Sequence, residues 1–541
     1  MVASSYLRPL VGWSVCLWAA RRAVEGAHWS ALRVSLLAWV LGHALRGSQH
    51  GAWRTLLWPT RAPRVEVLGF AAPGYEAVRE LLAAQLGRGM QLGAQVVAFV
   101  GGRRVVELWA AAPHSYRGAA VPYDGDSLQN IFSSSKALTS LVVAMLADRG
   151  ALRYEQRISE LWPAFGEGEH GEARAQLTVA QLMRHEAGLE SLGHAFAFEE
   201  LSAAGVARND VGAAVARAEP RWPEDGERRR YHGLTRGWIV NEIVRRVDPR
   251  ARTVGAFLRE EVAGPLGLDG DLLLGVPPDA AERVVPMFVP NPLWALLQSF
   301  VPAWAGRTVP FGPGWCLSHL WSEIKKNALL RTAIPFEDPF AAAARLRAAT
   351  AQPPLEGAPP QEAAAQRLLW AAGAAHPADK ASLIDDWNHP LTRGVEIPSA
   401  NAHANARAMA TVASAISCGG AHGGVRLLSE RGVARALEGG LLLPDVALEA
   451  TTKNVNAGWS VFDADATDDR QGFVGWQGYG GSCLQFHPRL QIGFGFAMNL
   501  AATDLNCAAF GNSNGLPGGG GYLHRELQMA VLEAAQREQQ S

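Results

Sequence analysis

A β-hairpin pattern followed by a helix pattern constrains the fold of this chain more than any other feature. Gln95–Val100 and Arg103–Trp109 are β-rich runs separated by Gly101-Gly102, and this arrangement predicts an antiparallel hairpin with a tight turn. After a loop, apolar residues recur at helical spacing from Ser133 until Asp148-Arg149-Gly150 ends the pattern. The sequence therefore predicts two paired strands of a sheet and, after them, a largely buried helix.

The predicted helix begins with a serine and a lysine three residues apart. Ser133 and Lys136 would lie on one helical face, where an unprotonated lysine amine can accept the serine proton. Burial would lower the pKa of the lysine, and the first turn would offer backbone N–H groups to a developing oxyanion. Ser322 and Lys325 have the same spacing but lead into polar residues that predict a solvated surface. Ser133 is therefore the candidate nucleophile and Lys136 its candidate base.

Composition excludes several other classes of function. A net charge of −1 over 541 residues argues against a nucleic-acid partner, and 48% hydrophobic residues support a substantial core. The five cysteines include no CxxC pair, which argues against a disulfide framework or a zinc site and favours a reducing compartment. Neither H-E-x-x-H nor H-x-H-x-D-H occurs. We expect neither a metal nor a cofactor.

Residues 1–65 differ in composition from the rest. The first sixty residues contain one acidic residue, Glu25, several arginines and two apolar runs, Pro9–Ala20 and Val34–Leu45. Each run is shorter than the roughly 20 apolar residues that cross a bilayer. Such a segment is typical of an organellar transit peptide (mitochondrion or plastid) or of helices at a membrane surface, and an extension packed on the domain is the third interpretation. Together with the cysteine content, this composition predicts an intracellular protein, organellar or membrane-associated.

Residues 66–541 are predicted to form one domain with an insertion at about 289–390. An α/β pattern runs from Ala71 to Phe288 and resumes at Ile397. The span between them is rich in Trp and Pro and then in Ala, Pro and Gln, which predicts a mixture of helix and loop. A buried cap is the preferred interpretation, and a lid or a membrane-contacting surface remains an alternative.

Several separated segments resemble a known superfamily. These are Ser133–Lys136, Ala147–Leu152, Ile158–Pro163, Leu177–Leu189 and Gly264–Leu268. The fourth is similar to the family pattern T-V-x-x-L-L-x-H-T-S-G-L and is the strongest single match. Together they resemble the serine β-lactamase-like superfamily, which includes class C β-lactamases, DD-peptidases and family VIII carboxylesterases.

The resemblance covers roughly residues 71–288 and 397–536 and implies a fold. An α/β (α+β) β-lactamase/transpeptidase-like fold has an antiparallel sheet covered by helices and an all-helical subdomain, with the active site between them. His185 lies within the strongest match, yet we expect it to hold a loop by hydrogen bonds and to take no part in catalysis.

The resemblance also implies two further motifs, both altered here. Tyr231-His232-Gly233 occupies the place of the family motif Y-x-N, so the tyrosine is retained and the asparagine is lost. Such a tyrosine can relay a proton if cationic neighbours lower its pKa. Trp476 stands where the family has the cation of K-T-G or H-x-G, and the W-x-G triplet that ends at Gly478 is similar to that of family VIII esterases. The resemblance implies that Trp476 and Gly478 bind substrate. Tyr479 is expected to supply a backbone N–H to the oxyanion hole beside Ser133.

These features predict a serine hydrolase that forms an acyl-enzyme with ester bonds, or amide bonds, of a small molecule or lipid. An alkoxide leaves more easily than an amine, and the lactam-recognising side chains are missing, so esters are preferred. A non-catalytic scaffold or lipid-surface protein is the first alternative, and a β-lactamase/DD-peptidase-like amidase is the second. Contact with a membrane surface and formation of a homo-oligomer stay open. Gly511–Gly515 matches G-x-S-x-G but lacks a downstream acid before its single histidine, which favours a turn.

Overall fold

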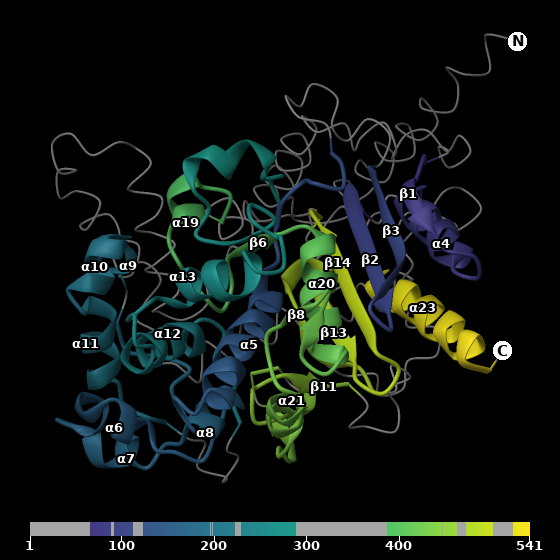
Figure 1. The fold of residues 1–541 in the computed structure, drawn as a ribbon. Coiled ribbons are helices and arrows are strands. Elements are labelled where there is room, and N and C mark those ends of the chain that lie inside the picture. The colour runs from purple at the N-terminus through teal and green to yellow at the C-terminus, as the bar shows by residue number, and fades with distance from the viewer. Residues whose placement is uncertain are drawn as a thin grey trace, which may run out of the picture.

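A nine-stranded antiparallel sheet forms one half of the molecule (Figure 1). The computed structural model describes residues 65–87, 91–111, 123–221 except 195 and 197, 229–287, 387–462 except 446 and 449, 472–500 and 523–540. The strand order is β1-β3-β2-β14-β13-β12-β11-β10-β9. In chain order, the strands are β1 (Leu68–Ala71), β2 (Gly93–Val100), β3 (Arg103–Ala111), β9 (Leu442–Asp445), β10 (Ala450–Asn454), β11 (Ser460–Val461), β12 (Val474–Gln477), β13 (Cys483–His487) and β14 (Ile492–Met498).

The predicted hairpin is confirmed. Strands β2 and β3 pair in antiparallel register, with Val100 opposite Arg103. Gly101 and Gly102 form the turn with φ values of 55° and 77°, a conformation that residues with a Cβ rarely adopt. Because β14 pairs with β2 from the far end of the sequence, the hairpin lies inside the sheet and not at its edge.

Helices cover both faces of this sheet, as predicted (Figure 1). Helices α4 (Glu76–Gly87) and α23 (Leu523–Gln540) lie together on one side, and α20 (Ala406–Ser417) packs across β14, β13 and β2 on the other. The contact with α20 is close because β14 carries glycines there. A Cβ on Gly493 would stand 2.3 Å from the Ser414 nitrogen, and one on Gly495 would stand 2.4 Å from the Ala406 oxygen.

A helical region lies beside the sheet, and α5 (Ser135–Asp148) stands between the two (Figure 1). Every α5 residue from 135 to 146 is buried, which confirms the predicted buried helix. The other helices of the helical region are α6 (Ile158–Leu161), η3 (Pro163–Gly166), α7 (Gly171–Ala175), α8 (Val179–Met183), α9 (Phe198–Leu201), α10 (Ala203–Ala207), α11 (Asp210–Arg217), α12 (Thr235–Val247), α13 (Val254–Leu258) and η4 (Arg259–Ala263). Further short elements are η5 (Pro278–Arg283), α19 (Pro390–Gly394), β7 (Ala421–His422), β8 (Val425–Arg426) and α21 (Glu430–Leu437).

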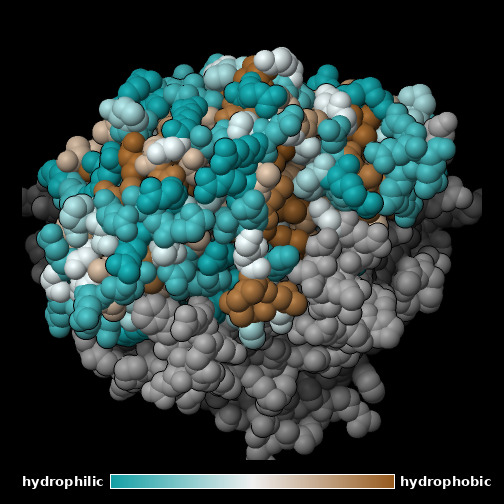
Figure 2. Space-filling view, turned by 60° about the horizontal axis from the view of Figure 1, so that its bottom comes forward, coloured by the Kyte–Doolittle hydropathy of each residue, from teal (hydrophilic) through white to brown (hydrophobic). Residues whose placement is uncertain are grey.

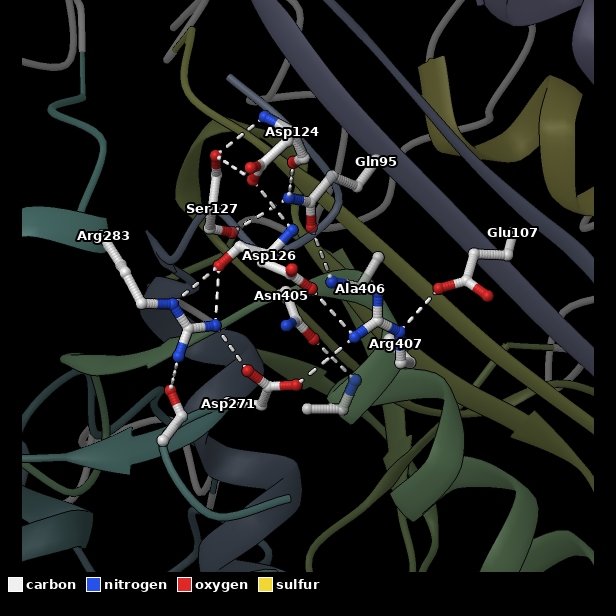
Figure 3. A network of polar contacts seen from close by, with 12 residues as sticks. Gln95, Glu107, Asp124, Asp126, Ser127, Asp271, Arg283, Asn405, Ala406 and Arg407 are labelled. Atoms are coloured by element: carbon white, nitrogen blue, oxygen red, sulfur yellow. Dashed lines mark hydrogen bonds and ion pairs between the residues drawn. The ribbon is translucent and has the colours of Figure 1, made fainter. Parts of the chain in front are cut away.

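A small second sheet connects the two halves. Its order is β4-β6-β5, with β4 at Gln129–Asn130, β6 at Ala402–Ala404 and β5 at Leu272–Leu274. A polar network around Arg407 holds the segment that enters β4 (Figure 3). The Arg407 guanidinium pairs with Glu107 of β3 at 2.6 Å and with Asp126 at 2.9 Å. The network therefore holds the chain segment that precedes Ser133 against the large sheet.

Several predicted segments lie outside the described residues. They include nearly all of the 1–65 extension, nearly all of the 289–390 insertion and the 511–515 motif, so their predicted roles and the domain limits stay predictions. Across the part that is described, every helix is too short or too polar to span a bilayer. Figure 2 shows a mostly hydrophilic face crossed by narrow apolar bands. The large apolar side chains exposed in the described residues are Leu68, Phe70, Leu441 and Leu442.

Candidate active site

Ser133 lies in the 3₁₀ turn η2 (Phe132–Ser134), directly before α5. The Asn130 side chain accepts a hydrogen bond from the Phe132 N–H at 2.8 Å, and Phe132 has a left-handed φ of 42°. A left-handed aromatic residue is strained, and such strain persists only where the surroundings hold it. Ser133 keeps part of its surface exposed, whereas its neighbours on both sides are buried. A constrained turn thus holds a partly exposed serine between buried neighbours.

Lys136 approaches this hydroxyl from within the protein. Its side chain has no exposed surface, and its Nζ lies 3.3 Å from Ser133 Oγ. The same nitrogen donates to the carbonyl oxygens of Gly233 at 2.6 Å and Ser399 at 3.0 Å. A neutral amine has two hydrogens and one lone pair, so these two carbonyls use both hydrogens and leave the lone pair for Ser133. The geometry suits a base that accepts the serine proton.

The electrostatic surroundings favour this neutral form. Burial lowers the pKa of Lys136 well below 10.5, and the positive charge of Arg236 lowers it further. This agrees with the desolvation expected from a buried helix. The aromatic ring of Tyr231 lies 4.7 Å from the nitrogen and partly encloses it.

Tyr231 completes the cluster, with its hydroxyl 2.6 Å from Ser133 Oγ. The proton relay predicted from the sequence needs cationic neighbours that lower its pKa, but burial has the larger effect and raises the pKa well above 10. Hydrogen bonding to Ser133 and the charge of Arg236 act in the opposite direction and are weaker. Tyr231 is therefore a protonated phenol in the resting site, suited to donating a proton.

The backbone around Tyr231 is held at three consecutive N–H groups. Arg230 N–H donates to the His185 carbonyl oxygen at 3.1 Å, and His232 N–H donates to His185 Nδ1 at 2.9 Å. Tyr231 N–H donates to Asp445 Oδ1 at 3.1 Å. His185 thus makes the loop-holding hydrogen bonds that were expected of it. Burial lowers its pKa well below 6.5, so it is neutral.

Gly233 lacks the side-chain amide of the family asparagine but keeps a backbone contact with Lys136. It offers no side-chain amide to a substrate, yet its carbonyl oxygen binds Lys136. A Cβ at this position would meet only the Tyr231 ring, at 3.7 Å. The glycine is therefore not required for packing.

The W-x-G segment runs from the end of β12 into the short helix η7 (Tyr479–Gly481). Its three predicted site residues, Trp476, Gly478 and Tyr479, differ in burial and in their contacts. Trp476 was expected to line the substrate site, but only 3% of its surface is exposed and its Nε1 donates to the Gly458 oxygen at 2.7 Å. It therefore acts as a packing residue of the site, because its large ring packs against Lys136 and His185. Tyr479 keeps part of its surface exposed, and its ring contacts that of Phe132 edge-on at 5.5 Å.

Gly478 has a packing role, and its predicted role as a substrate-binding residue stays a prediction. Its N–H donates to the Ser482 carbonyl oxygen, so this group is already paired. A Cβ on it would stand 2.2 Å from both the Ile131 oxygen and Ser482 Oγ. The glycine allows the end of β12 to approach the turn η2, which carries Ser133.

Three residues near the site were missed by sequence reasoning: Ser399, Asp445 and Arg236. Ser399 and Asp445 act from 263 and 214 residues away from their partners, and neither lies in a recognisable motif. Arg236 lies five residues after Tyr231 and is the one charged residue in the first half of α12, which was a usable signal. Among the described residues, no group of three or more His, Cys, Asp or Glu side chains is arranged to hold a metal ion.

Comparison with known proteins identifies the family. The family model described as Beta-lactamase matches residues 78–509, which is most of the chain. The chain belongs to the Beta-lactamase family. At that level it is a β-lactamase-related hydrolase, and the resemblance seen in the sequence motifs is confirmed.

Relatives of this Beta-lactamase family member extend the comparison. It is 33% identical over 238 residues to "Esterase/beta-lactamase LipL" of Mycobacterium tuberculosis, and the match covers 42% of this chain and 50% of LipL. The chain thus spans about half the length of that relative.

Solved structures agree on the fold. A family VIII carboxylesterase superposes with a TM-score of 0.59 at 23% identity, covering 87% of this chain and 99% of that one. A penicillin-binding protein homologue from Caulobacter crescentus gives 0.58 at 24%, covering 87% and 100%. At these identities the likeness shows the β-lactamase/transpeptidase-like fold alone.

Proposed function

We propose that this protein is a serine hydrolase that cleaves ester bonds of a small molecule or lipid through an acyl-enzyme. The observation that carries the proposal is the position of Ser133 Oγ, 2.6 Å from the Tyr231 hydroxyl and 3.3 Å from Lys136 Nζ. The partly exposed serine has a buried base within reach and a phenol hydrogen-bonded to it. A purely structural serine has no need of a desolvated lysine.

In the proposed reaction, Ser133 Oγ attacks the ester carbonyl carbon and its proton passes to Lys136 Nζ. The carbonyl oxygen becomes an oxyanion, which the backbone N–H groups of Ser133 and Tyr479 are proposed to bind. Tyr231 gives its phenolic proton to the departing alkoxide and regains a proton from the Lys136 ammonium. Water then attacks the acyl-enzyme, Lys136 accepts a proton from the water, and Ser133 leaves as a restored hydroxyl.

Two features favour esters over β-lactams or peptides. Gly233 has no side-chain amide to hold an amide substrate, and the buried Trp476 replaces the cation that would attract a carboxylate. The printed names of LipL and of the family VIII carboxylesterase point in the same direction. LipL is also named a β-lactamase, so lactam hydrolysis is the second candidate.

A non-catalytic scaffold and a DD-peptidase-like amidase would each require a different site. A scaffold needs no arrangement of Ser133, Lys136 and Tyr231, and their close approach argues against it. A DD-peptidase-like amidase needs a cationic side chain from the insertion, which lies outside the described residues.

The test is intact mass after incubation with a fluorophosphonate, on the wild type, Ser133→Ala and Ser134→Ala. Ser134 is a matched control, because it is adjacent and buried and its hydroxyl bonds Ser482 Oγ at 3.2 Å. We expect one adduct on the wild type and on Ser134→Ala, and none on Ser133→Ala. Untreated wild type is then assayed on p-nitrophenyl esters and on a chromogenic cephalosporin, and the esters should be hydrolysed faster. A well-folded wild type that gains no adduct would refute the proposal in favour of the scaffold.

A further inference from the structure

Arg236 is a buried cation next to the site that the proposed reaction does not use. It lies in the first turn of α12 and has no exposed surface. Its Nη1 donates to the carbonyl oxygens of Met183 and Gly458, both at 3.1 Å, and its Nη2 donates to that of Lys136 at 2.9 Å. Nη2 also donates to the hydroxyl oxygens of Thr139 at 3.3 Å and Ser140 at 3.5 Å. All five acceptors are neutral. Across the described residues, no carboxylate forms an ion pair with this guanidinium, and its Nε has no hydrogen-bond partner.

The guanidinium and the Lys136 amine pack against the same aromatic ring. Arg236 Cζ lies 5.2 Å from the centre of the Trp476 ring, and Lys136 Nζ lies 5.9 Å from it. The charge of Arg236 lowers the pKa of Lys136, because two positive charges against one buried ring repel each other and water screens them little. Only one of the two side chains can be charged at moderate cost.

The protonation of the surrounding groups decides which side chain carries the charge. His185, His232 and Tyr231 enclose the pair; burial lowers the pKa of both histidines and raises that of the tyrosine, so all three are neutral near pH 7. Asp445 faces the site through the Tyr231 backbone and has its pKa raised by burial. Burial lowers the pKa of Arg236 to about 9, which still leaves it charged at neutral pH.

We propose that Arg236 is a positioning residue whose fixed, unpaired charge keeps Lys136 in its amine form, ready to accept the proton of Ser133. The hydrogen bond to the Lys136 carbonyl also fixes the first turn of α5. The role of Arg236 in catalysis rests on the proposed function, but its effect on the protonation of Lys136 does not.

The test is an NMR titration of lysine in the full-length protein. The chain contains five lysines, so ¹³Cε-lysine labelling gives few signals, and Lys136→Met identifies the relevant one. The titration midpoint of Lys136 is then compared in the wild type, Arg236→Gln and Arg236→Lys. Arg174→Gln is the matched control, because Arg174 is equally buried and its guanidinium likewise donates to neutral acceptors, here backbone carbonyls that include Phe165 at 2.8 Å and Glu169 at 3.0 Å.

We expect the Lys136 midpoint to rise by about one pH unit or more in Arg236→Gln, because the repulsion is gone. It should stay at the wild-type value in Arg174→Gln and remain low in Arg236→Lys, which keeps the charge. An unchanged midpoint in folded Arg236→Gln would overturn the proposal, as would a wild-type midpoint near 10.5. If Arg236→Gln does not fold, Lys136 is titrated in Arg236→Met, which also removes the charge, and an unchanged midpoint there overturns the proposal. None of these outcomes depends on fluorophosphonate labelling, so the inference and the proposed function fail separately.

Discussion

Lys136 links the chemistry of the site to the stability of the protein. Its amine is buried and its pKa lies well below 10.5, whereas in the unfolded chain the amine takes a proton at ordinary pH. The unfolded state therefore binds more protons between these two pKa values, and the stability of the folded state falls as pH drops through that window. The buried amine that is the proposed base thus also makes the stability of the fold sensitive to pH.

The Lys136→Met variant should remove this dependence. We expect the free energy of unfolding of the wild type, relative to the variant, to fall by about 1.4 kcal/mol for each pH unit below 10.5 until the folded-state pKa is reached. Urea unfolding of both proteins at pH 10 and pH 7 measures it. Equal differences at the two pH values would mean that Lys136 is charged in the folded protein.

Tyr231 should matter in proportion to how much the leaving group needs a proton. Tyr231→Phe removes the hydroxyl 2.6 Å from Ser133 Oγ but keeps the backbone bond to Asp445. We expect kcat/KM to fall on the order of 10²- to 10⁴-fold for an alkyl ester and much less for a p-nitrophenyl ester, whose phenolate leaves unprotonated. Steady-state kinetics on an alkyl ester and a p-nitrophenyl ester of the same acid give the ratio of the two kcat/KM values. Tyr479→Phe is the control, and a ratio that does not change in Tyr231→Phe would exclude proton donation to the leaving group.

At the scale of elements, the site depends on how closely β12 approaches the turn η2, which carries Ser133. Gly478→Ala would place a Cβ 2.2 Å from the Ile131 oxygen, whereas Gly233→Ala would place one no closer than 3.7 Å to any neighbour. We expect Gly478→Ala to lose about 2 kcal/mol of stability and to slow fluorophosphonate labelling on the order of 10²-fold. Gly233→Ala should keep the wild-type stability and labelling rate. Thermal unfolding and labelling time courses test both, and equal behaviour of the two variants would mean that this close approach does not control the site.

The same elements explain what the sequence could and could not predict. The β2–β3 hairpin and α5 were predictable because their patterns are local, and Tyr231 was found because Tyr231-His232-Gly233 resembles the family motif Y-x-N. Ser399 was not, because it contributes a backbone carbonyl, which any residue has. Trp476 was assigned to the correct strand but to the wrong surroundings. Neither the burial of a ring nor the distant partners of Lys136 can be derived from local periodicity.

At the scale of the whole molecule, the site lies where the sheet, the helical region and the small second sheet meet. Three buried histidines belong to this junction, and burial lowers the pKa of each: well below 6.5 for His185, to about 4 for His232 and to about 3 for His403. In the unfolded chain such side chains take a proton near pH 6.5. Their contribution to stability is therefore complete above about pH 6.5 and is lost as pH falls toward the folded-state values.

We therefore expect acid to unfold the protein cooperatively, with each buried histidine removing about 1.4 kcal/mol per pH unit below 6.5. His403→Gln should reduce the slope of unfolding free energy against pH between 6.5 and 5, because His403 belongs to β6 and stays neutral in the folded state. His170→Gln, at an exposed position, is the control and should leave the slope unchanged. Urea unfolding at several pH values measures these slopes. If His403→Gln and His170→Gln gave the same slope as the wild type, the acid sensitivity would have to arise elsewhere than in this junction.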